Sequence, residues 1–138
     1  MGMLSMKFNS DEMFDLLQSS LRPGETLTAA VYGSFYQTGF FASNRNVEAG
    51  YIGLSDCGRL FGIRCSFLST ENFSYEIAFL KKIKIKKALF GARNINIDGP
   101  EGEMRFAVMP KITGRKFPDQ PENFQRILEA LEAKQATL

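Results

Sequence analysis

Histidine and tryptophan are both missing from this chain of 138 residues, and cysteine occurs only twice. Without histidine the chain lacks the commonest general base, so neither a Ser-His-Asp triad nor a Cys-His pair can form within it. A structural zinc site usually takes four cysteine or histidine ligands, and only Cys57 and Cys65 are present. These absences argue against an enzyme, and we expect neither a metal nor another cofactor.

Long apolar runs and targeting signals are missing too. No apolar run approaches the roughly 20 residues that span a bilayer. Residues 1 to 8 lack the apolar core of a signal peptide, and Met6 stands where a myristoylation signal after Gly2 has Ser or Thr. Two cysteines are too few for a disulfide framework. We therefore predict a reduced, cytoplasmic protein.

The residues that are present suit a single globular domain. Hydrophobic residues make up 44% of the chain, and thirteen Phe with four Tyr predict an aromatic core of the kind that favours β-structure. The net charge is only +2, and the pI of about 8.6 is below that of typical nucleic-acid-binding domains. Nucleic acid is therefore not an expected partner.

Two helices are predicted, one near each end of the chain. The first covers residues 9 to 22, where Asn9 and Glu12 form a capping-box pattern. The second begins near Pro121, a residue that the first turn of a helix tolerates. Its large apolar residues follow the spacing i, i+3, i+4, i+7 and form one stripe: Phe124, Ile127, Leu128 and Leu131.

Strand-forming segments fill the region between the helices. The clearest signal is GYIGLSDCGRLFG, residues 50 to 62, in which two strand-like runs flank a turn that contains Asp56 and Gly58. Short connections favour antiparallel pairing. The expected strands are residues 27–35, 47–54, 59–67, 73–80, 82–89, 93–98 and 103–109.

This order of elements resembles the pleckstrin-homology (PH) superfold, in particular bacterial PH-like and GRAM-like domains. The hairpin of residues 50 to 61 is similar to the family pattern of a glycine, a strand, a polar turn and Arg-Leu-aromatic, with Gly58 as one extra residue. Residues 75 to 97 match its aromatic-acid-Ile, basic strand, glycine and Ile-x-Ile progression. The likeness covers residues 24 to 134. It implies about seven antiparallel strands in a bent barrel or sandwich with a C-terminal capping helix, and it leaves the N-terminal helix as an addition.

The resemblance also implies a function class. Such a domain is expected to be a non-enzymatic binding or assembly module that acts through protein–protein contacts in a bacterial cytoplasm, and it is expected to form homo-oligomers. Two alternatives stay open. The first is a peripheral domain that binds anionic membranes with the strand of residues 81 to 87, and the second is a carrier of a small ligand.

Lysines are concentrated in residues 81 to 87, where they alternate with Ile83 and Ile85. The period of a strand places Lys82, Lys84 and Lys86 on one face. The cluster is either a solvated edge strand that lysines protect from aggregation, or a patch for an anionic partner such as a lipid headgroup or an acidic protein.

Other candidates lie in loops and turns. Phe40 and Phe41 either belong to the core or form an exposed contact surface. Arg59 either binds an anion at the mouth of the hairpin or forms an ion pair with Asp56 that fixes the turn. Cys57 is either an ordinary turn residue or a thiol made reactive by Arg59. The candidate binding residues are Phe40, Phe41, Arg59, Lys82, Lys84, Lys86 and Lys87.

Overall fold

A computed structural model describes residues 5–36, 48–67, 69–112 and 117–138. Within these ranges the chain forms two α-helices and seven antiparallel strands, which confirms the predicted mainly-β class with a helix near each end. The elements are α1 Ser10–Ser19, β1 Leu27–Tyr36, β2 Glu48–Ser55, β3 Arg59–Cys65, β4 Thr70–Glu76, β5 Lys82–Lys87, β6 Arg93–Gly99, β7 Gly102–Val108 and α2 Gln120–Gln135.

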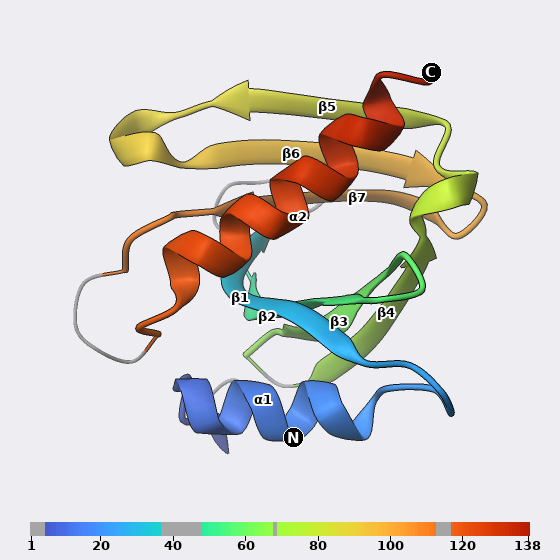
Figure 1. Cartoon of the computed structure of the whole chain (residues 1–138). Coiled ribbons are helices and arrows are strands. Elements are labelled where there is room, and N and C mark those ends of the chain that lie inside the picture. Colours follow the sequence, from blue (N-terminus) through green and yellow to red (C-terminus); the bar gives the residue numbers. More distant parts are fainter. Residues whose placement is uncertain (1–4, 37–47, 68, 113–116) are drawn as a thin grey trace.

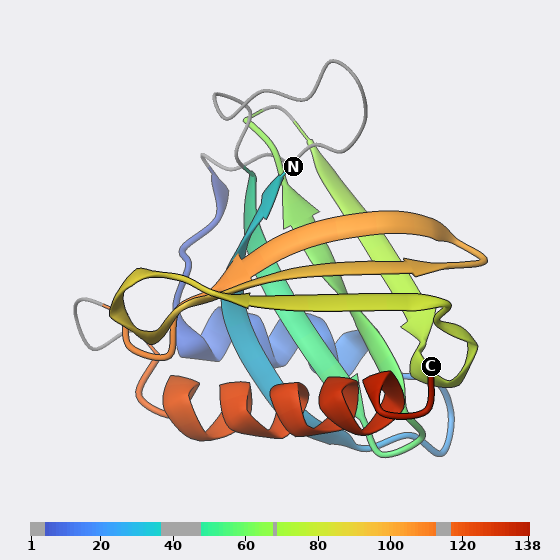
Figure 2. The ribbon, with the colours of Figure 1, turned by 90° about the horizontal axis from the view of Figure 1, so that it is seen from above.

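The seven strands form one strongly bent sheet in the order β4-β3-β2-β1-β7-β6-β5. Strands β5 to β7 lie as one layer over β1 to β4, and α2 crosses the open side between the layers (Figure 1). Seen from above, the strands of the two layers cross each other (Figure 2). The sheet does not close, so β4 and β5 are its two edges.

The main core lies between the two layers and under α2. All four residues of the predicted stripe on α2 are buried, and they belong to the same cluster as Ile95, Ile97 and Phe106. Each large side chain that is buried in this way contributes about 1.5–3 kcal/mol. The amphipathic C-terminal helix therefore covers the open side of the sheet, as its sequence predicts.

Helix α1 packs against the other face of the β1–β3 region (Figure 1). Its Met13 and Leu17 contact Tyr51 and other buried residues there. Asn9 caps the helix by accepting a hydrogen bond of 2.8 Å from the Glu12 backbone N–H. The Glu12 carboxylate accepts a hydrogen bond of 2.6 Å from the Tyr51 hydroxyl, and this bond attaches the start of α1 to β2.

Three predicted strand boundaries are wrong. Strand β4 begins at Thr70, whereas the predicted strand began at residue 73. The sequence at the start of β4 is polar, but pairing with β3 supplies the backbone hydrogen bonds of a strand. It ends at Glu76, and a short 3₁₀ helix, Ile77–Phe79, follows. Strand β5 ends at Lys87, and Leu89–Gly91 forms a tight turn instead of extending the strand.

Two glycines allow β2 and β3 to approach each other closely. A Cβ atom on Gly50 would overlap the carbonyl oxygen of Ile63, and one on Gly62 would overlap the carbonyl oxygen of Tyr51. We predict that Gly50→Ala lowers the free energy of unfolding by about 1–3 kcal/mol in a urea titration. The control is Gly33→Ala, where the nearest atoms would lie 3.1 Å away. An equal loss in the two variants would contradict this interpretation.

Candidate functional site

A row of polar side chains crosses the outer face of β5, β6, β7 and the end of β1. Lys84 lies opposite Asn96, Asn96 opposite Arg105, and Arg105 opposite Tyr36. The isoleucines that alternate with these residues on β5 and β6 point into the core, so the row faces away from α2. We call the following set the basic face: Tyr36, Lys84, Lys86, Asn94, Asn96 and Arg105. These residues, with Ile95 and Phe106, line an open cleft of about 560 Å³.

The basic face carries three cations that have no ion-pair partner in the described part of the chain. Lys84, Lys86 and Arg105 are exposed, and none of the three forms an ion pair or hydrogen bond with another residue that the structure describes. Asp98 and Glu103 lie one row away, where both align with Lys82. Three cations on one face, without an anion among them, favour the binding of an anionic ligand.

Asn96 lies between Lys84 and Arg105 in the row. Its Oδ1 atom is buried and has no hydrogen-bond partner among the described residues. A buried acceptor without a partner is costly, and such atoms are rare in native structures. Because this oxygen is covered, it is not a contact for a ligand, and the cleft offers the three cationic side chains alone. This arrangement suits a ligand that carries several anionic groups.

The prediction that Lys82, Lys84 and Lys86 share one face of a strand is confirmed, and this strand, β5, lies at an edge of the sheet. The C-terminal end of α2 covers part of this edge, because Gln135 Nε2 donates a hydrogen bond of 2.8 Å to the Ile83 carbonyl. Protection of an edge accounts for the lysines of β5, but it does not account for Arg105 on an interior strand.

Arg59 is the first residue of β3, directly after the turn, but it does not pair with Asp56. Its guanidinium is buried and binds Glu25 through two hydrogen bonds, Nη2 to Oε1 at 2.6 Å and Nε to Oε2 at 3.0 Å. Asp56 instead accepts a hydrogen bond of 2.9 Å from the backbone N–H of Thr26. The sequence did not reveal this pairing, because Glu25 lies 34 positions before Arg59. Burial removes Arg59 from contact with an external partner.

The cysteines behave as ordinary residues. Cys57 is exposed in the turn, as predicted. Desolvation and the Asp56 carboxylate raise the pKa of its thiol, which favours the ordinary turn residue over a thiol activated by Arg59. Burial raises the pKa of Cys65 to about 11, which suits a thiol that acts as a small apolar side chain. Phe40 and Phe41 lie outside the described residues.

Sequence reasoning missed an exposed apolar tip between β5 and β6. Leu89 is 79% exposed and Phe90 is 84% exposed. Phe90 also adopts a positive φ of 60°, which is uncommon for an aromatic residue. The prediction placed Leu89 at the end of a strand. A signal was nonetheless present, since Gly91 directly after two apolar residues marks a turn.

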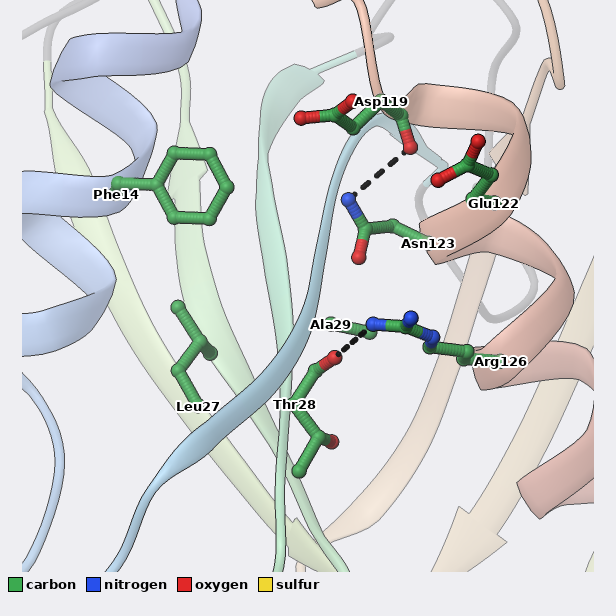
Figure 3. Close-up of a pocket in the computed structure, with 8 residues that line it drawn as sticks. All are labelled: Phe14, Leu27, Thr28, Ala29, Asp119, Glu122, Asn123 and Arg126. Atoms are coloured by element: carbon green, nitrogen blue, oxygen red, sulfur yellow. Dashed lines mark hydrogen bonds between the residues drawn. The ribbon is translucent and has the colours of Figure 1, made fainter.

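A second, smaller cavity of about 340 Å³ lies between α1 and α2 over the start of β1 (Figure 3). Its polar groups are largely engaged in internal bonds. Arg126 donates to the Thr28 carbonyl at 3.0 Å, and Asn123 donates to the Asp119 carbonyl at 3.0 Å (Figure 3). These bonds fasten α2 to β1 and stabilise its first turn, so the cavity is best understood as part of the packing of α2.

The described ranges contain neither a candidate metal centre nor a helix that could span a membrane. No group of three or more Cys, Asp or Glu side chains there is placed to hold a metal ion. No helix in that part of the chain is long and apolar enough to cross a bilayer. No family model and no curated protein matches this chain.

Proposed function

We propose that this protein is a non-enzymatic, PH-like binding module of a bacterial cytoplasm that binds another protein through its basic face. The observation that carries the proposal is the open cleft lined by three exposed cations, Lys84, Lys86 and Arg105, none of which has an ion-pair partner among the described residues. The bent seven-stranded sheet with a C-terminal helix agrees with the PH-like resemblance of the hairpin. Binding, rather than catalysis, also agrees with the absence of histidine.

The dimensions of the basic face favour a macromolecular partner over a small carried ligand. Neighbouring strands lie about 4.8 Å apart, so the row from Lys84 on β5 to Tyr36 on β1 extends across about 14 Å. The cleft is open along this row. A broad, open and charged surface suits contacts that are spread over a protein partner, whereas small ligands usually bind in enclosed, mostly apolar pockets.

An anionic membrane is the second candidate, and the exposed tip favours it. Leu89 and Phe90 protrude directly after Lys86 and Lys87, which are also exposed. An apolar tip beside basic residues is a typical combination for peripheral membrane binding. In this alternative the tip, rather than the centre of the basic face, makes the main contact.

Paired variants distinguish the two candidates. We expect labelled poly-L-glutamate to bind the wild-type protein at low salt, and Lys84→Glu/Lys86→Glu to reduce this binding by at least about tenfold, because the reversed charges repel the polymer. The double variant Leu89→Ser/Phe90→Ser should leave the binding of polyglutamate unchanged. The control is Lys7→Glu/Lys134→Glu, which changes the net charge equally at positions away from the basic face.

Flotation with vesicles rich in phosphatidylserine tests the membrane. Binding to vesicles that is lost in Leu89→Ser/Phe90→Ser, without any binding of polyglutamate, would contradict the protein-binding proposal and support the membrane. Equal polyglutamate binding by the wild type and Lys84→Glu/Lys86→Glu would also contradict it, since the basic face would then play no part.

A further inference from the structure

We infer that the basic face recognises an extended segment with three consecutive acidic residues in its partner protein, aligned along β5 to β7. The inference rests on the proposed function and names the chemistry of the partner. It follows from the spacing of the three cations along β5 and across the sheet.

The two lysines have the repeat of an extended chain. Residues i and i+2 of a strand lie on one face, about 6.6–6.8 Å apart. Lys84 and Lys86 are two such residues of β5. An extended partner running beside β5 has the same repeat, so its acidic side chains at positions i and i+2 align with the two lysines. A helix does not offer this match, because residues i and i+2 of a helix do not face the same way.

Arg105 provides the third contact on the opposite side. It lies two strands from Lys84, a separation of about 9.5 Å, with Asn96 between them. Suppose that the partner segment lies above β6 with its side chains pointing sideways. Its residues i and i+2 then point toward β5, and its residue i+1 points toward β7. The acidic residue at i+1 then meets Arg105, so all three cations are matched by consecutive residues.

Two fluorescein-labelled peptides of identical composition test the arrangement. One carries three consecutive Glu residues flanked by Gly and Ser, and the other carries the same three Glu residues four positions apart. Anisotropy titrations at low salt should give binding about tenfold tighter for the consecutive peptide. Arg105→Glu should abolish this preference.

The possible results separate this inference from the proposed function. Equal affinity for the two peptides, with both sensitive to Lys84→Glu/Lys86→Glu, would overturn the inference and leave the proposed function standing. Complete displacement of the consecutive peptide by millimolar inorganic phosphate would overturn the inference in favour of a site for small anions. No binding of either peptide or of polyglutamate would overturn both proposals.

Discussion

Replacing Glu25 with alanine is expected to lower the free energy of unfolding by about 3–5 kcal/mol, because it leaves the buried charge of Arg59 without its counter-ion. The side chains of Arg59 and Glu25 are only 5% and 6% exposed. Arg59 also donates to the Ser20 carbonyl at 3.0 Å and to Ser74 at 3.2 Å, so its guanidinium is held by several segments at once. Urea denaturation at neutral pH measures the loss.

The matched control for this prediction is an exposed ion pair of the same protein. Arg22 and Glu76 form a bond of 2.8 Å, but their side chains are 59% and 34% exposed. Arg22→Ala is therefore expected to cost less than about 1 kcal/mol. A loss in Glu25→Ala that is no larger than the loss in Arg22→Ala would show that burial does not strengthen the Arg59–Glu25 pair.

The pH dependence of stability gives a second check on the same pair. Hydrogen bonds from Arg59 lower the pKa of Glu25 from 4.5 to about 2, against the opposing effect of desolvation. Because the folded-state pKa is the lower one, the contribution of Glu25 is complete above pH 4.5 and is lost as the pH falls toward 2. Glu25→Gln should remove this part of the acid sensitivity. An unchanged slope of stability between pH 4.5 and 2 would contradict the assignment.

Replacing Gln120 with leucine is the second change expected to have a large effect, about 3 kcal/mol or more, since it leaves three backbone groups without partners at about 1–3 kcal/mol each. Gln120 is 2% exposed. Its Oε1 accepts from the Tyr32 N–H at 3.0 Å, and its Nε2 donates to the Tyr32 carbonyl at 2.9 Å and to the Met109 carbonyl at 3.0 Å. The side chain thus takes the place of a neighbouring strand where β1 and β7 separate.

Thermal and urea denaturation of Gln120→Leu measure this effect. The control is Gln125→Leu, an exposed position of the same helix whose side chain makes one bond, of 3.3 Å, to Glu129. We expect the control to change stability by less than about 0.5 kcal/mol. Similar values for the two variants would contradict the role assigned to Gln120.

Elements that depend on local chemistry were predictable. The hairpin of β2 and β3 follows from Asp56 and Gly58, and Gly58 indeed adopts a positive φ of 80° in the turn. Ile95 and Ile97, which alternate with two asparagines, show the strand period in the sequence itself, and both isoleucines are buried. These signals lie within a few residues of each other, so the chain order alone displays them.

The site was predictable only in part. The lysines of β5 attracted notice because they are clustered in the sequence, and their shared face follows from the period of a strand. Arg105 and Asn96 were not recognised as candidates, because each is an isolated polar residue in an alternating segment. Only the register of β5, β6 and β7 places Asn96 between Lys84 and Arg105.

The sequence by itself therefore determined the class of the fold, the two helices and the face of β5 that carries the lysines, because helix and strand periods are local properties of the chain. The tertiary structure alone decided that Arg59 pairs with Glu25, that Gln120 substitutes for a strand, and that Arg105 lies on the same face as Lys84 and Lys86. Each of these depends on contacts between distant segments. Their alignment is set by the bend and pairing of the sheet, which no local pattern specifies.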